Sequence, residues 1–147
     1  MSRLPILALV LGLAAPALAH GYTGGAIRID HPVIRVASPV SKTGAGYLAI
    51  TNTGKTPDRL LSVTTSAANR SDLHGTIARG AIMQMRAQAG GVPVPAGGTV
   101  TFAPGGLHIM FIGLQRPLPK GTRIKARLTF AKAGSVDVEF AAETAAG

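Results

Sequence analysis

The chain has 147 residues, a formal net charge of +9 and no cysteine, so disulfides and thiolate chemistry are excluded. This length suits a single domain. With no tryptophan, two tyrosines and four phenylalanines, the chain has few side chains that stack on bases. We therefore expect no nucleic-acid partner, despite the positive charge.

Residues 1–19 predict a secretory signal peptide. Arg3 precedes a short apolar run, and Ala17-Leu18-Ala19 has the small residues of a signal-peptidase site. We expect export to the periplasm and cleavage after Ala19, which leaves residues 20–147 as one domain. Its 14 basic and six acidic residues give a net charge of +8. No later apolar run is long enough to cross a bilayer, so we expect no stable membrane insertion.

The mature chain has the alternation of β-strands at residues 27–29, 46–51 and 59–64. Frequent glycine and proline residues separate the apolar runs and disfavour long helices. Seven to nine short strands with regular turns predict an all-β sandwich or a small barrel.

The last two strands are expected over residues 122–130 and 136–140. In the first of them, alternate residues from Ile124 to Phe130 are apolar and should point inward. Arg123, Lys125 and Arg127 then share the outer face, where the following strand offers acidic neighbours. This pattern predicts an antiparallel hairpin with a solvated, charged outer face.

Histidine and methionine residues gather in one part of the mature chain. Five of its seven His and Met residues fall between positions 74 and 110. His108 and Met110 are two apart in a β-prone run, so their side chains share one face. Met83 and Met85 have the same relation on an earlier strand, and His74 is expected in a loop after residues 71–73. Two strands and a loop can thus converge on one site.

Neutral imidazoles and thioethers are ligands that favour Cu(I) over hard cations or zinc. The alternative is that the methionines fill gaps in the core and the histidines are structural. An electron-transfer blue-copper centre is excluded, because it needs a cysteine ligand. No catalytic signature stands out in the sequence, so we do not expect an enzyme.

These residues resemble the periplasmic PCuAC copper chaperones, whose motif is a His, ten residues, a Met, about twenty-one residues and then His-x-Met. Here ten residues separate His74 from Met85, and 22 residues separate Met85 from His108-Ile109-Met110. The resemblance covers most of residues 26–142. It implies a cupredoxin-like Greek-key β-sandwich with His74, Met85, His108 and Met110 as Cu(I) ligands and Met83 as a possible accessory.

The resemblance also implies a function. Members of this family deliver Cu(I) to respiratory oxidase assembly, at the copper centre of cytochrome c oxidase. The expected partner is therefore a copper-accepting oxidase subunit or another copper chaperone. The alternative is a periplasmic protein that sequesters copper for homeostasis, without a dedicated acceptor.

Two histidines lie outside the motif. Cleavage after Ala19 would make His20 the first residue, and its α-amine and imidazole together would form a nitrogen pair suited to Cu(II). The alternative is that residues 20–25 are a flexible tail with an arbitrary first residue. His31 precedes Pro32 and has no methionine nearby, so we expect a structural role for it.

Overall fold

The computed structural model describes residues 21–144, and for residues 77–79 and 83 it describes the backbone only. These residues form eleven strands and no helix, which confirms the predicted all-β class. The count exceeds the expected seven to nine partly because short segments such as Gly21–Gly24 also pair. The strands are β1 (Gly21–Gly24), β2 (Ile27–Val36), β3 (Thr43–Asn52), β4 (Asp58–Thr64), β5 (Ala68–Arg79), β6 (Ile82–Ala87), β7 (Val92–Val94), β8 (Thr99–Phe102), β9 (His108–Leu114), β10 (Arg123–Phe130) and β11 (Gly134–Thr144).

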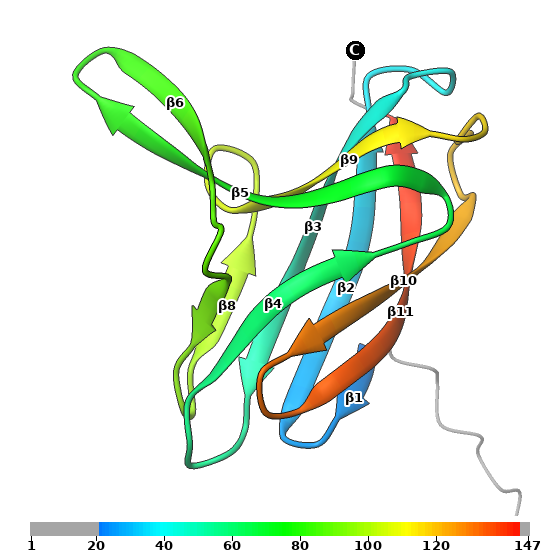
Figure 1. Ribbon diagram of the computed structural model, residues 1–147. Helices are drawn as coiled ribbons and strands as arrows, with labels where there is room; N and C mark the ends of the chain where they lie inside the picture. Colours follow the sequence, from blue (N-terminus) through cyan, green and yellow to red (C-terminus); the bar gives the residue numbers. More distant parts are fainter. Residues whose placement is uncertain (1–20, 145–147) are drawn as a thin grey trace, which may run out of the picture.

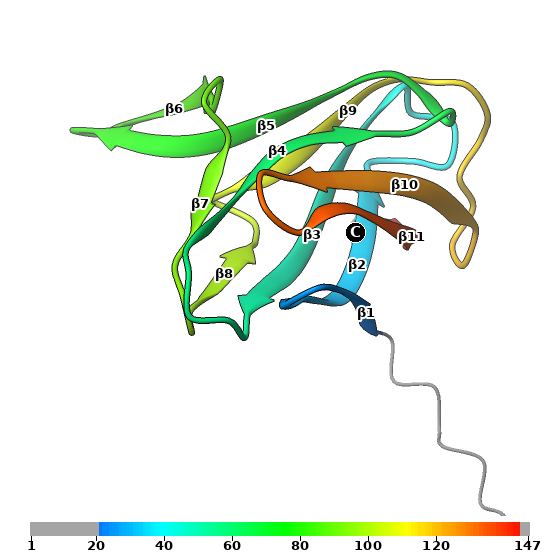
Figure 2. The ribbon, with the colours of Figure 1, turned by 60° about the horizontal axis from the view of Figure 1, so that its bottom comes forward.

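All strands belong to one hydrogen-bonded sheet that folds over on itself. The order is β6-β5-β9-β3-β2-β11-β10-β4-β7, with β1 added on β2 and β8 on β3. Within residues 21–144, β2 and β11 are the only strands that pair in parallel. Figures 1 and 2 show β4 and β10 crossing over β2 and β3, and β4 lies against β5 although the two are far apart in the strand order. The result is a sandwich closed around one core.

The core is built from the inward-facing residues of nearly every strand. Phe111 on β9 and Phe140 on β11 meet edge to face, with ring centroids 5.3 Å apart. Gly46 on β3 makes room for them, since a Cβ atom there would lie 2.7 Å from the Phe111 ring. A side chain at position 46 would therefore push β3 and β9 apart.

The terminal hairpin has the predicted faces, but its turn is shorter than expected, because Phe130 already pairs with Gly134. Its inward residues from Ile124 to Phe130 are buried, and Arg127 lies opposite Asp137. The Arg127 Nε donates to Asp137 Oδ1 over 2.8 Å, and this hydrogen bond lowers the pKa of the Asp137 carboxyl. The second strand is longer than expected: β11 continues to Thr144 and pairs with β2.

Asp58 at the start of β4 fixes the turn between β10 and β11. Its Oδ1 accepts hydrogen bonds from the backbone N–H groups of Arg59 (2.7 Å) and Lys132 (2.8 Å). Its Oδ2 accepts one from Ala133 (2.9 Å). Burial raises the pKa of the Asp58 carboxyl, but these three donors and the nearby Lys132 charge outweigh that effect and hold it below its ordinary value.

One part of the sheet stands apart from this body. The β5–β6 hairpin projects away from the sandwich, and β6 is the terminal strand of the sheet (Figure 1). Residues 21–144 contain no helix of the length and hydropathy that crossing a bilayer would require.

Candidate metal centre

The expected metal-binding region lies where β5 passes beside β9. His74 sits within β5, directly opposite His108 on the antiparallel strand β9. The expected loop position of His74 was therefore wrong, because β5 runs unbroken from Ala68 to Arg79. The two imidazole rings are perpendicular, with centroids 5.5 Å apart.

His108 is buried, with 6% of its surface exposed, and its ring is held in one orientation. Its Nδ1 lies 3.0 Å from the carbonyl oxygen of Gly106. Because a carbonyl only accepts, this contact places the proton on Nδ1 and leaves a lone pair on Nε2. The Nε2 atom is buried and has no hydrogen-bond partner in the described part of the chain.

His74 presents a second nitrogen of the same kind. Its Nδ1 is buried and likewise lacks a hydrogen-bond partner among residues 21–144. Its Nε2 lies 3.9 Å from the Oδ2 of Asp72, two residues earlier on β5. A buried polar atom without a partner costs about 1–3 kcal/mol, so two on facing strands require an explanation. A metal ion is one ligand that would use both lone pairs.

The two methionines of the motif lie on the same face of the sheet as the histidines. Met110 is two residues beyond His108 and is half-buried. Met85 on β6 lies opposite Thr76, which is two residues beyond His74 on β5. Residues that are opposite each other or two apart on one strand project to the same side of the sheet. The side chains of His74, Met85, His108 and Met110 therefore lie on one face. Met85 is the most open of them, with 61% of its surface exposed.

The two accessory candidates are placed differently. Met83 lies opposite Ala78, one alternate position farther from His74 along the β5–β6 pair than Met85. Only the backbone of Met83 is described, so this pairing gives its register position alone. His20 precedes the described residues.

Sequence reasoning missed Asp72, which shares this face. It lies opposite Met110 and forms an ion pair with Arg70 at 3.0 Å in addition to its contact with His74. Strand alternation around His74 would have revealed it if β5 had been recognised as a strand. Among the described residues, no three His, Cys, Asp or Glu side chains are grouped to hold a metal. The other candidate donors on this face are the thioethers of Met85 and Met110.

Known proteins are similar to this chain in sequence and in fold. The family model described as "Putative lipoprotein LpqE-like" matches residues 27–142. A protein of Leifsonia xyli subsp. xyli, named "Putative lipoprotein Lxx21020", is 32% identical over 118 residues, which cover 80% of this chain and 70% of that protein.

Solved structures with a similar fold include copper-bound proteins. The copper-bound PCuAC domain from PmoF2 has a TM-score of 0.72 and 28% identity, covering 86% of this chain and 99% of that domain. The Cu(I) form of DR1885 from Deinococcus radiodurans has a TM-score of 0.62 and 25% identity, covering 86% of this chain and 80% of its own. The chain belongs to the LpqE-like family, and its fold is that of the PCuAC domains, as the resemblance in its sequence predicted.

Proposed function

We propose that this protein is an exported copper chaperone that carries one Cu(I) ion on His74, Met85, His108 and Met110. The observation that carries this proposal is the pair of buried, unpartnered nitrogens, His74 Nδ1 and His108 Nε2, on directly opposed strand positions. Protein donors satisfy most buried polar atoms, and a metal ion would satisfy both of these at once.

The donor set favours Cu(I) as the cargo. Thioethers are soft ligands, and two neutral imidazoles with two thioethers add no negative charge to a monovalent ion. The Gly106 carbonyl supports the same reading, because it fixes the His108 tautomer whose Nε2 is free to coordinate. The copper-bound PCuAC domain from PmoF2 and the Cu(I) form of DR1885 have the same fold.

The unequal burial of the ligands supports transfer rather than permanent storage. His108 is buried, whereas Met85 on the projecting hairpin is 61% exposed. An incoming ligand from an acceptor can reach the ion from the Met85 side and replace this thioether first. The buried His108 and the half-buried His74 would hold the ion until the acceptor has bound.

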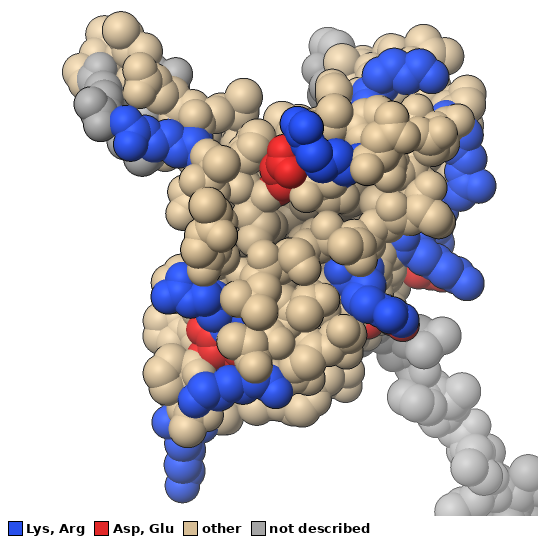
Figure 3. All heavy atoms as spheres, viewed as in Figure 1, with Lys and Arg blue, Asp and Glu red and all other residues tan. Residues whose placement is uncertain are grey.

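The acceptor that we propose is a respiratory oxidase subunit or another chaperone that supplies it. Figure 3 shows lysine and arginine side chains scattered over the side of the molecule that it draws, with fewer acidic ones between them. Together with the net charge of the mature chain, this distribution would attract an acidic acceptor and speed the encounter. We further propose that the signal peptide is removed after Ala19 in the periplasm. The name of the Leifsonia relative, a lipoprotein, supports export.

X-ray absorption of the purified mature protein loaded with Cu(I) tests the site. We expect one copper per chain, with sulfur and nitrogen both in its first coordination sphere. Copper bound by nitrogen and oxygen alone would contradict the thioether ligands. Mixing the loaded protein with an oxidase copper domain then separates delivery from sequestration, since a sequestering protein would retain its copper.

A further inference from the structure

Asp72 lies on the face of the proposed Cu(I) site without being one of its ligands. It is two residues before His74 on β5 and directly opposite Met110 on β9, so two of the proposed ligands are its neighbours. Carboxylate oxygens favour harder ions than Cu(I). A carboxylate in this position therefore calls for a role other than binding the ion.

The Oδ2 atom of Asp72 has a neighbour on each side. The Nε of Arg70 lies 3.0 Å from it, and the Nε2 of His74 lies 3.9 Å from it. Arg70, Asp72 and His74 occupy alternate positions of β5, so the aspartate stands between the other two. The guanidinium thus holds the carboxylate in place beside the imidazole.

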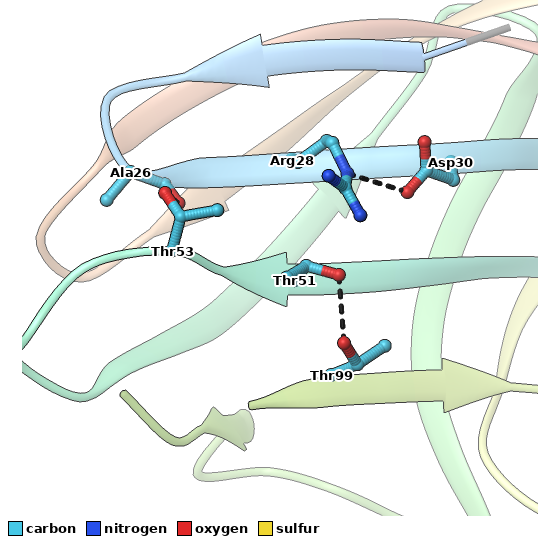
Figure 4. Close-up of polar contacts among 6 residues, drawn as sticks. All are labelled: Ala26, Arg28, Asp30, Thr51, Thr53 and Thr99. Atoms are coloured by element: carbon cyan, nitrogen blue, oxygen red, sulfur yellow. Dashed lines mark hydrogen bonds and ion pairs between the residues drawn. The ribbon is translucent and has the colours of Figure 1, made fainter. Parts of the chain in front are cut away.

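A second ion pair in the sheet has the same construction without a histidine. Arg28 and Asp30 are two residues apart on β2, and their Nε and Oδ2 atoms also lie 3.0 Å apart (Figure 4). Asp30 and Asp72 are equally exposed, at 31%. In the described part of the chain, Asp30 forms no ion pair with a histidine, whereas Asp72 does. Exposed ion pairs contribute little to stability, so the neighbouring imidazole is what distinguishes Asp72.

The place of Asp72 bears on which nitrogen of a neutral His74 carries the proton. A carboxylate only accepts hydrogen bonds, so it favours a proton on Nε2 and a lone pair on Nδ1. Nδ1 is the buried nitrogen that has no partner among residues 21–144. His108 has the opposite arrangement, because the Gly106 carbonyl lies beside its Nδ1 and its Nε2 is unpartnered. Each ring thus has one nitrogen beside an acceptor and one buried nitrogen left free.

We infer that Asp72 is a positioning residue, which keeps the proton of His74 on Nε2 and so presents Nδ1 to the Cu(I) ion. A separation of 3.9 Å is longer than a hydrogen bond, so the carboxylate acts through the attraction of its charge for the N–H dipole. Ligating histidines commonly have a carboxylate or carbonyl at their other nitrogen. That Nδ1 binds Cu(I) rests on the proposed function, whereas the tautomer is a property of the protein without metal.

The tautomer is measured first, by ¹H–¹⁵N NMR of the metal-free protein at a pH well above about 6.5, where imidazoles are neutral. The ¹⁵N shifts distinguish a protonated ring nitrogen from one with a lone pair. We expect the Nε2-protonated form alone for His74 in the wild type and a mixture of both forms in Asp72→Ala. Asp30→Ala is the matched control, because it removes the same kind of ion pair, and it should leave the His74 spectrum unchanged. A wild-type proton on Nδ1, or no change in Asp72→Ala, would overturn the inference.

Cu(I) affinity is then measured by competition with a chelator. Asp72→Ala should weaken binding about 10-fold, since loss of the partner of a ligand costs 10–100-fold. Asp72→Asn keeps the shape and an acceptor oxygen, so it should recover part of this loss. Asp30→Ala should bind Cu(I) as the wild type does. An equal loss in Asp30→Ala and Asp72→Ala would assign the effect to the ion pair and contradict a positioning role.

A double variant tests whether Asp72 acts through His74. In a His74→Leu background, Asp72→Ala should cause no further loss of Cu(I) affinity, because the ring that it positions is gone. A full second loss would mean that the carboxylate reaches the ion directly, which would refute the inference. If His74→Leu alone keeps wild-type Cu(I) affinity, the proposed Cu(I) site is wrong, and the NMR result still decides whether Asp72 fixes the tautomer.

Discussion

The turn between β10 and β11 and the strand pair β5–β9 both contain buried polar atoms. The two regions differ in whether the described chain supplies hydrogen-bond partners for these atoms. The carboxylate of Asp58 accepts three backbone hydrogen bonds between 2.7 and 2.9 Å. His74 and His108 each keep a buried nitrogen that has no partner in the described chain. The first region is complete when the chain folds, whereas the second would be completed by the proposed Cu(I) ion. We therefore expect substitutions at the Asp58 turn to lower stability and substitutions at the histidine pair to lower copper affinity.

The largest effect on stability is expected from Asp58→Ala. Removing the carboxylate leaves the N–H groups of Arg59, Lys132 and Ala133 without their acceptor, which should cost about 3 kcal/mol. Urea unfolding of the apo-protein measures this loss. Because the hydrogen bonds of Asp58 go to Arg59, Lys132 and Ala133 and not to any proposed ligand, Cu(I) affinity of the folded fraction should not change. A parallel loss of affinity would show that the two regions are coupled.

The largest effect on binding is expected from His108→Leu. Loss of a ligand should weaken Cu(I) binding at least about 100-fold, since changes to the partners of ligands already cost 10–100-fold. Stability should change by less than about 1 kcal/mol, because the lost hydrogen bond to Gly106 is offset by removal of an unpartnered buried nitrogen. Competition with a Cu(I) chelator and urea unfolding measure the two quantities. Severe unfolding with unchanged affinity would make His108 a structural residue.

A smaller loss, about 10-fold, is expected from Met110→Leu, which keeps the approximate volume and deletes the thioether. The thermal midpoint of the apo-protein should change little. Met83→Leu is the matched control, because Met83 lies one alternate position farther from His74 than Met85 does. Equal losses of Cu(I) affinity in Met83→Leu and Met85→Leu would show that both methionines can serve as ligands.

The smallest effect is the acid dependence of Asp58. Its carboxyl has a lowered pKa in the folded protein, so its contribution to stability is complete above the ordinary value of about 3.9. That contribution is lost as the pH falls through the lower folded value. Unfolding free energies of wild type and Asp58→Asn should therefore converge as the pH falls from about 5 through the lowered folded pKa. Parallel curves would mean that this carboxyl does not titrate with folding.

Local patterns in the sequence predicted the terminal hairpin well. Its alternation fixed which residues of β10 face inward, and it placed basic side chains opposite acidic ones, as the Arg127–Asp137 pair confirms. The same method failed for β5. His74 is followed by Gly75 and Thr76 rather than by an apolar alternation, so the strand was mistaken for a loop. Pairing with β6 and β9 on both sides is what holds this polar segment extended.

Pairings between distant segments were not predictable from such patterns. The parallel contact of β11 with β2 joins residues more than a hundred positions apart, and nothing local encodes it. Residues 21–24, which the alternative interpretation of the N-terminal segment made part of a flexible tail, pair with β2. The spacing of the motif predicted that His108 and Met110 share a face. Only the structure shows that His74 and His108 each have a buried nitrogen without a hydrogen-bond partner in the described chain.

The exposure of Met85 also has a chemical consequence. An open thioether is readily oxidised to the sulfoxide, a polar and poorer ligand for a soft ion, and copper itself generates oxidants. The exposure that would open the proposed site to an acceptor would therefore also open it to damage in an oxidising compartment. Mild peroxide treatment should add oxygen to Met85 before the half-buried Met110, as peptide mass spectrometry can show. Copper loading would then depend on an enzyme that reduces methionine sulfoxide.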